Sequence, residues 1–287
     1  MLRTFLRQTS IFLSIFISKK IIFNYKKHKK IEKFIKKKAN EFYIENPRLR
    51  THRNLSSEIL NIIKSNNLKK FLRNSIIQNI FFIHNRFFIF FEFLELKNDK
   101  NWKTWKKLIL ENDIGKPIRF FLYSNSSGNR IRQVYIIKKF LDSAKLINLE
   151  KIQNIIEIGG GYGCMADIFK KYNKNISYTI YDMFEVNLLQ FYFLKMNNLN
   201  PALGKISSKL NLINDLKLVE KYSNTKKNYF FIANWSISEF PKNFREKFFN
   251  TIYQSQYSII SFQENFENIN NLKFFKKILK RLGNKFI

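Results

Sequence analysis

The chain has 287 residues, of which 45% are hydrophobic and 17% aromatic, enough apolar material for one large or two smaller folded domains. Its 52 Lys and Arg residues outnumber its 21 Asp and Glu residues and give a formal net charge of +31. The basic residues are scattered along the chain, and no nucleic-acid-binding motif accompanies them. Because no such motif is present, the charge alone does not indicate nucleic acid as the partner, and it indicates only affinity for anionic surfaces or substrates.

A single cysteine, Cys164, excludes an intrachain disulfide framework and a cysteine-rich metal site. The three histidines, at positions 28, 52 and 84, lie in the first third of the chain and never at metal-ligand spacing. We therefore expect no metal centre, and the scarcity of cysteine favours a reducing, cytoplasmic location.

The N-terminus is basic and apolar, since Arg3 and Arg7 precede an apolar run at residues 11–17. This run is too short to span a bilayer, and a Ser-Lys-Lys sequence follows it where a signal peptide would have small residues. Two interpretations fit: an amphipathic helix that rests on the inner membrane as a peripheral contact, or a helix that packs on the body of the protein.

Residues 1–115 are expected to be mostly helical. Lys pairs alternate with Ile and Phe at residues 25–38, which predicts a helix with a narrow apolar stripe. Another helix is expected to begin at Ser56 or Ser57. The run at 71–96 is apolar on too many faces for a surface helix, so it is either a buried helix or a pair of strands.

A turn-like break near residue 115 marks the expected domain boundary, so that 116–287 forms a second domain. Residues 124–129 are predicted to form a polar loop, and residues 131–141 a helix. After residue 150, short apolar runs alternate with longer helical patterns, which predicts an α/β, doubly wound, mostly parallel sheet. The expected strands are 155–158, 176–181, 229–233 and 257–262, and the expected helices are 165–172 and 186–196, with an amphipathic stretch at 244–253.

A glycine-rich turn follows the first of these strands and opens a helix. It reads Glu157-Ile158-Gly159-Gly160-Gly161-Tyr162-Gly163. The dinucleotide pattern G-x-G-x-x-G fails here because its last position falls on Cys164, and no Gly-Lys-Ser/Thr follows to make a P-loop. Asp182 closes the next expected strand, where a carboxylate can accept hydrogen bonds from both hydroxyls of a ribose. A structural glycine turn in another α/β protein is the alternative.

The pattern E-x-G-x-G-x-G resembles the first motif of class I S-adenosylmethionine-dependent methyltransferases. Together with residues 181–194, 234–241 and 261–264, it resembles the bacterial sugar O-methyltransferase family over roughly residues 115–275. The resemblance implies a Rossmann-like sheet of class I methyltransferase type and S-adenosylmethionine as cofactor. Two departures are present: Met183-Phe184 replaces an expected Leu-Pro, and the last strands of such a sheet are missing or reduced.

On this resemblance, the residues expected to bind the cofactor are Glu157, Gly159, Gly161, Tyr162, Gly163, Asp182 and Asn234. Transfer to a hydroxyl needs a general base, and no histidine lies in the α/β part, so the candidates are the carboxylates Glu239 and Glu264. Substrate contacts are expected from Trp235, Ser238, Asn129 and Arg132.

Each of these assignments has a structural alternative. Glu239 could cap a helix, Trp235 could be a buried packing residue, and Cys164 could be a thiol of lowered pKa or a small packed side chain. The expected function is methylation of a hydroxyl on a sugar or glycan precursor, as in polysaccharide biosynthesis. The alternatives are methylation of another small molecule or of nucleic acid, and a catalytically inactive scaffold with the same fold.

Overall fold

The computed structural model describes residues 23–45, 55–65, 67–82, 86–145, 149–150, 152–226 and 228–282. The N-terminal apolar run and two histidines, His52 and His84, lie outside these residues. The chain forms two compact units. Unit 1 comprises Met1–Lys139, Tyr162–Tyr172 and Leu188–Leu199, and unit 2 comprises Phe140–Gly161, Asn173–Asn187 and Asn200–Ile287. The predicted division of the chain near residue 115 stays a prediction.

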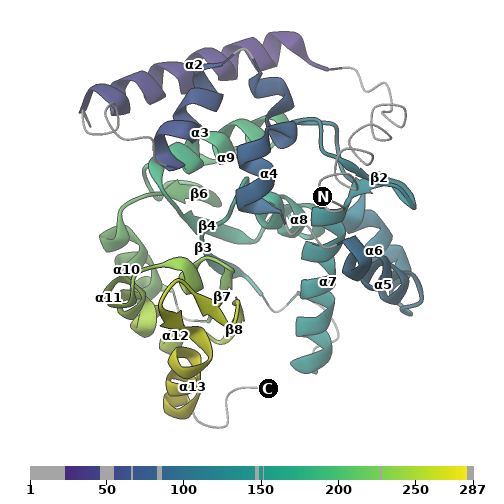
Figure 1. Cartoon of the computed structure of the whole chain (residues 1–287), viewed down its shortest axis with the longest axis vertical. Helices are drawn as coiled ribbons and strands as arrows, with labels where there is room; N and C mark the ends of the chain where they lie inside the picture. Colours follow the sequence, from purple (N-terminus) through teal and green to yellow (C-terminus); the bar gives the residue numbers. More distant parts are fainter. Residues whose placement is uncertain are drawn as a thin grey trace. The chain divides into compact units, whose positions relative to one another are not determined.

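Unit 1 contains the helical N-terminal region that the sequence predicts (Figure 1). The described residues of the apolar run 71–96 are helical, because all of them except Asn74 and Phe82 fall within η2, α4 and α5, and none forms a strand. The elements before the first strand are α2 (Tyr25–Glu45), α3 (Leu55–Lys64), η2 (Leu68–Arg73), α4 (Ser75–Phe81), α5 (Arg86–Lys97) and α6 (Trp102–Ile109). The hairpin β1 (Arg119–Phe120) and β2 (Tyr123–Ser127) follows, and then α7 (Gly128–Ser143). Helix α8 (Cys164–Tyr172) also belongs to unit 1.

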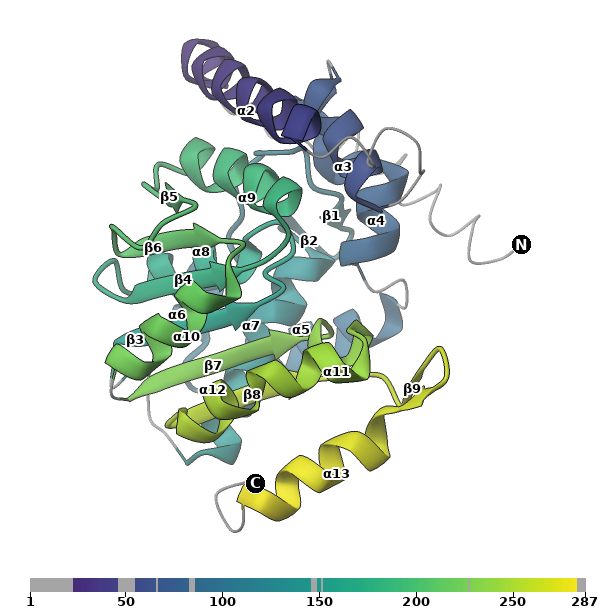
Figure 2. The same ribbon diagram turned by 90° about the vertical axis from the view of Figure 1, so that its left-hand side faces the viewer.

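Unit 2 is built on a six-stranded parallel sheet in the order β5-β6-β4-β3-β7-β8 (Figure 2). The four expected strands are confirmed as β3 (Asn154–Ile158), β4 (Ser177–Tyr181), β7 (Tyr229–Asn234) and β8 (Tyr257–Ser261). Helix α9 (Phe184–Met196) follows β4 as expected. The predicted stretch 244–253 forms α11 (Lys242–Arg245), η4 (Glu246–Phe248) and α12 (Phe249–Gln254).

The sequence did not predict β5 (Ala202–Leu203), β6 (Leu210–Ile213) or α10 (Leu216–Thr225) of unit 2. Strand β6 carries a polar residue at its centre, Asn211, which hides the apolar pattern. The structure accounts for it, because the Asn211 amide is fully buried and donates a hydrogen bond to the Thr179 hydroxyl at 3.1 Å. A buried amide with a partner costs little, so the strand tolerates it.

The two faces of β3 differ in character. Ile156 and Ile158 lie in an apolar cluster of unit 2 that includes Val219, Phe231 and Phe248. Because side chains alternate along a strand, Glu157 points to the opposite face. A carboxylate thus lies in a strand whose other buried side chains are isoleucines.

Beyond β8, the strands β9 (Asn265–Phe266) and β10 (Ile269–Asn270) pair only with each other, and α13 (Asn271–Leu282) follows. Among the described residues, the six-stranded sheet contains no antiparallel strand.

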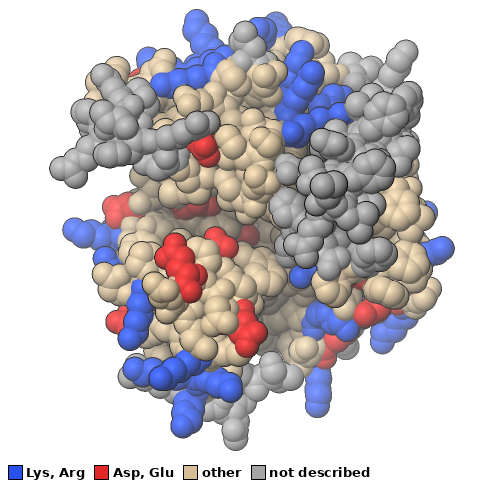
Figure 3. Space-filling model, in the orientation of Figure 1, with Lys and Arg blue, Asp and Glu red and all other residues tan. Residues whose placement is uncertain are grey.

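None of the helices in the described part of the chain is both long and apolar enough to cross a bilayer. Charged side chains are unevenly placed, since several Asp and Glu side chains gather near the middle of the face in Figure 3 while most Lys and Arg lie toward its rim.

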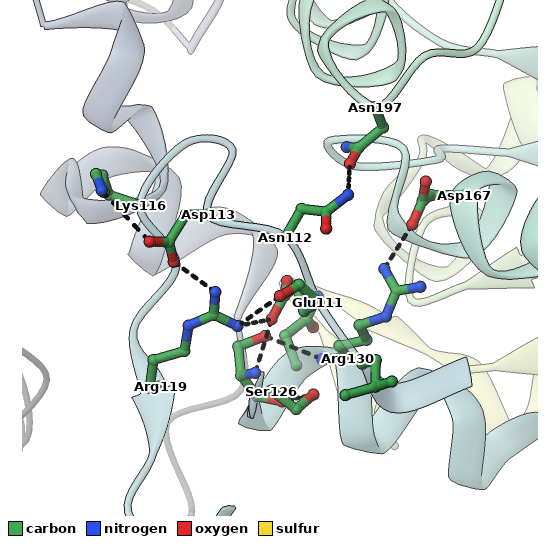
Figure 4. A network of polar contacts seen from close by, with 12 residues as sticks. Glu111, Asn112, Asp113, Lys116, Arg119, Ser126, Arg130, Asp167 and Asn197 are labelled. Carbon is green, nitrogen blue, oxygen red and sulfur yellow. Dashed lines mark hydrogen bonds and ion pairs between the residues drawn. The ribbon is translucent and has the colours of Figure 1, made fainter. Parts of the chain in front are cut away.

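A network of buried ions lies in unit 1 (Figure 4). Arg119 contacts the carboxylate of Asp113 at 2.5 Å and that of Glu111 at 3.6 Å. Arg130, with a side chain only 1% exposed, contacts Asp167 of α8 at 2.6 Å. These pairs hold the segment around the hairpin against α8 and neutralise charges that burial would otherwise make very costly.

The network overturns the predicted polar loop at 124–129, which is instead β2 and the first turn of α7. The Glu111 carboxylate accepts a hydrogen bond from the Ser127 backbone amide at 2.7 Å, and the Glu111 amide donates to the Asn125 carbonyl at 3.0 Å. Glu111 lies outside the segment 124–129, so the polar composition of that segment alone indicated a loop.

We predict that Asp167→Asn lowers the free energy of unfolding by about 3–5 kcal/mol, because it leaves the Arg130 charge buried without its carboxylate. Glu95→Gln removes the partner of Lys139, a pair whose side chains are 46% and 51% exposed, and should cost about 1 kcal/mol or less. Urea unfolding of both variants measures the two costs. Equal losses would contradict a structural role for the buried pair.

Candidate functional site

The candidate site lies where the strands of the unit 2 sheet end. Strands β3, β4, β7 and β8 are parallel neighbours, so their carboxyl ends meet at one edge. Ligands of such sheets bind outside this edge. The residues that follow these strands are Gly159, Asp182, Trp235 and Phe262.

The glycine turn after β3 has no space for a side chain at its first position. Gly159 has a φ of +71°, and a Cβ there would lie 2.3 Å from the Cβ of Ser236. The Ser236 hydroxyl donates a hydrogen bond to the Ile158 carbonyl, and the Gly159 amide donates to the Tyr181 carbonyl at 2.9 Å. The segments after β3 and β7 are thereby locked together, with the backbone of the turn at the strand ends.

We predict that Gly159→Ala destabilises the protein more than Gly204→Ala, a matched control with the same φ of +71° but no atom within 4 Å of its Cβ position. The backbone conformation alone should cost about 1–2 kcal/mol in both variants. Displacing Ser236 should add about 1–3 kcal/mol at Gly159. Thermal or urea unfolding measures the difference, and equal losses would show that the Gly159–Ser236 contact is unimportant.

Glu157 is a buried carboxylate beside this turn. It is 3% exposed, and its Oε2 accepts a hydrogen bond from the Tyr178 hydroxyl at 2.8 Å. Burial raises the pKa of Glu157 to about 8, with a smaller contribution in the same direction from the charge of Asp182. A positive charge brought to this carboxylate would favour its ionised form.

This raised pKa predicts how stability depends on pH. The pKa of Glu157 is about 8 in the folded protein and near the ordinary value of 4.5 when unfolded. Between these values the folded state holds a proton that the unfolded state has released, so Glu157 makes stability fall as pH rises, by at most about 1.4 kcal/mol per pH unit. Glu157→Gln should be less sensitive to pH over this window, as measured by urea unfolding at several pH values. Identical profiles would contradict the raised pKa.

Asp182 follows β4 directly, in a turn held by backbone contacts. Its amide donates to the Ile213 carbonyl at 3.0 Å, and its Oδ1 accepts from the Met183 amide at 2.9 Å. The Asn187 side chain donates to the Asp182 carbonyl at 3.3 Å. Met183-Phe184, where the resemblance leads us to expect Leu-Pro, is compatible with this turn, because α9 begins at Phe184.

The ends of β7 and β8 are joined through Asn234 and Trp235. The Ser261 hydroxyl donates to the Asn234 side-chain oxygen at 3.0 Å, and the Trp235 amide donates to the Ser261 carbonyl at 2.8 Å. Trp235 has a φ of +67°, which is rare for a bulky residue and costs about 1–3 kcal/mol. Trp235 therefore has an unfavourable backbone conformation at the strand end, and its indole is half-buried.

A chain of polar contacts connects Glu239, one of the two candidate bases, to buried Ser238. Ser238 is fully buried, and its hydroxyl lies 3.0 Å from the Trp235 carbonyl and 2.9 Å from the Gln263 side-chain oxygen. The Gln263 amide nitrogen lies 3.5 Å from an oxygen of Glu239. Desolvation raises the pKa of Glu239 above its ordinary value. Glu264 is exposed, and its backbone carbonyl accepts from the Asn271 amide at 2.9 Å.

Gly161, with a φ of +55°, belongs to unit 2, whereas Tyr162, Gly163, Asn129 and Arg132 belong to unit 1. Tyr162 is buried, and its hydroxyl accepts a hydrogen bond from Asn129 at 3.1 Å. Gly163 has a φ of +92° and packs against Leu194. Arg132 is paired with Glu92 at 2.6 Å. Asn129 and Arg132 thus have partners within unit 1.

Cys164 is a buried thiol, 4% exposed. Burial raises its pKa to about 12. The interpretation of a thiol with lowered pKa is therefore wrong, because burial, together with the charges of Glu111 and Asp167, outweighs the charge of Arg130. Cys164 is the small packed residue of the alternative interpretation.

The turns after β3 and β4 carry acidic groups and no basic ones. Residues 157–163 and 181–185 include Glu157, Asp182 and Glu185 but no Lys, Arg or His, although the chain has a net charge of +31. In the described part of the chain, no group of three or more His, Cys, Asp or Glu side chains could hold a metal ion. A ligand that carries positive charge and lacks phosphate fits these turns better than a dinucleotide does.

Sequence reasoning missed Ser236, Tyr178 and Gln263, which hold the predicted residues in place. Ser236 and Gln263 lie inside the segments 234–241 and 261–264 that carry the resemblance, so their position after a strand was the available signal. Tyr178 gave no such signal, because its role depends on the pairing of β4 with β3. Comparison with protein-family models and with curated proteins finds no match for this chain.

Proposed function

We propose that the protein is an S-adenosylmethionine-dependent methyltransferase that acts on a hydroxyl of a sugar or glycan precursor. The observation that supports this most is the edge of the unit 2 sheet, where a glycine turn without space for side chains lies between two carboxylates, Glu157 and Asp182. The sugar acceptor is supported by the resemblance of residues 181–194, 234–241 and 261–264 to the sugar O-methyltransferase family.

The cofactor would be held by two carboxylates, by the backbone of the glycine turn and by the Asn234 side chain. Asp182 would accept hydrogen bonds from the ribose hydroxyls, and Glu157 would face the ammonium group, whose charge favours the ionised carboxylate. The turn at Gly159 and Gly161 would bring backbone close to the ligand, because side chains are absent there. Asn234 would orient the amino-acid end. When bound, the cofactor supplies an electrophilic methyl group.

The acceptor would lie beside the ends of β7 and β8. Glu239 is the better candidate for the base, because its pKa is raised toward neutral pH, and a carboxylate of higher pKa is a better proton acceptor. Gln263 would orient the Glu239 carboxylate, and Trp235 would present its ring to the acceptor. Glu264 is the second candidate base, since it also follows β8.

We predict that S-adenosylmethionine or S-adenosylhomocysteine raises the melting temperature of the purified protein, by the linkage that holds for any ligand of the folded state. Asp182→Ala should abolish the shift. Glu220→Ala, which removes an exposed carboxylate of α10, should leave it unchanged. Differential scanning fluorimetry measures all three proteins.

The absence of a shift with either ligand would contradict the cofactor assignment. A shift without methyl transfer into a panel of sugars and sugar nucleotides would instead support the inactive scaffold. A nucleic-acid substrate would show binding that falls steeply with salt, and more steeply than that of a control protein of equal charge.

A further inference from the structure

A pocket lies in unit 1, away from the residues used above. It is an open cavity of about 250 Å³ between α6 and the end of α8, lined by Lys103, Thr104, Lys107, Leu108 and Tyr172. Lys103 and Lys107 are one helical turn apart, so they lie on the same face of α6. The lining therefore offers two ammonium groups and two hydroxyls, and no carboxylate.

These two lysines differ from others of unit 1. Among the residues that the structure describes, Lys103 and Lys107 make no ion pair. The nearby acid Asp167 is already engaged by Arg130 at 2.6 Å. Other lysines of the unit have carboxylate partners: Lys36 with Glu32, Lys38 with Glu41, Lys116 with Asp113, Lys138 with Asp99 and Lys139 with Glu95.

A third lysine, Lys171, is affected by the charge of Lys107. Its ammonium group donates to the Leu110 carbonyl at 2.8 Å. Burial lowers the pKa of Lys171 to about 8, and the charges of Arg130 and Lys107 act in the same direction, while those of Asp167 and Glu111 oppose them. The C-terminal carbonyls of α8 carry about half a negative charge, which is less than the charge of either pocket lysine. The side chains that line the pocket are therefore positively charged.

We propose that this pocket binds a phosphate group, either free or as a phosphomonoester. Two lysines match the two charges of a phosphate dianion, and the hydroxyls of Thr104 and Tyr172 can donate hydrogen bonds to its oxygens. The volume of 250 Å³ is below the range of about 300–1,000 Å³ for pockets that enclose a drug-sized ligand. This volume suits a phosphate with a small substituent. The proposal is independent of the methyltransferase assignment.

The direct test is calorimetric titration of the full chain with inorganic phosphate at constant ionic strength. Lys103→Gln/Lys107→Gln should weaken binding by about tenfold or more, and Thr104→Val by about threefold, because charge-assisted contacts are lost. Lys97→Gln/Lys139→Gln is the matched control, since it also removes two exposed lysines of unit 1 but none that lines the pocket, and it should leave affinity within about twofold. Unchanged melting temperatures verify that the variants are folded.

The affinity should also depend on pH in a defined way. Above pH 8 the ligand stays a dianion while Lys171 loses its proton, so affinity should fall as pH rises from about 7.5 to 9. Lys171→Gln should remove this dependence. Equal binding by the pocket double variant and by the control double variant Lys97→Gln/Lys139→Gln would overturn the proposal, because net charge alone would then explain the binding. An equal dependence of both affinities on sodium chloride would overturn it for the same reason.

The source of the phosphate can be separated in the same experiment. Vesicles that contain phosphatidate present the group on a lipid surface, whereas inorganic phosphate presents it in solution. Co-sedimentation with these vesicles that is lost in the pocket double variant would assign a lipid headgroup. Titration by inorganic phosphate without co-sedimentation would assign a soluble phosphomonoester. Failure of both would overturn the site, and it would leave the binding of S-adenosylmethionine unaffected.

Discussion

The contact between Gly159 and Ser236 is the constraint on which the candidate site depends. A Cβ at Gly159 would lie 2.3 Å from that of Ser236, and the Ser236 hydroxyl donates to the carbonyl of Ile158. This contact forces the segment after β7 against the turn after β3. The positive φ of Trp235, one residue before Ser236, belongs to the same arrangement, because the chain must turn sharply there while its amide stays bonded to Ser261.

Charge distribution is the second feature of the site. In a protein with a net charge of +31, the strand ends of unit 2 carry Glu157 and Asp182, and burial keeps the pKa of Glu157 near 8. Such a carboxylate stays largely protonated at neutral pH and ionises when a cation approaches. Unit 1 has the opposite character at α6, where Lys103 and Lys107 line a pocket with no carboxylate. The two places therefore suit ligands of opposite charge.

Sequence patterns predict the local elements of unit 2 well, because a buried parallel strand and the glycine turn that follows it are visible in adjacent residues. Strands β3, β4, β7 and β8 and the position of Asp182 after β4 illustrate this. The failures have a common cause. The segment 124–129 forms β2 because Glu111 bonds its backbone, and Asn211 sits in β6 because Thr179 satisfies its amide. Partners distant in sequence decide both cases, and they also decide the roles of Tyr178 and Ser236.

The central claim is that the turns after β3 and β4 bind the methyl donor. Hydrogen exchange of the full chain, followed by mass spectrometry with and without S-adenosylhomocysteine, tests it most directly. The claim predicts slower exchange in peptides that cover residues 157–163 and 181–185, and no such change in Asp182→Ala. Protection confined to other segments, or equal protection in the variant, would contradict it.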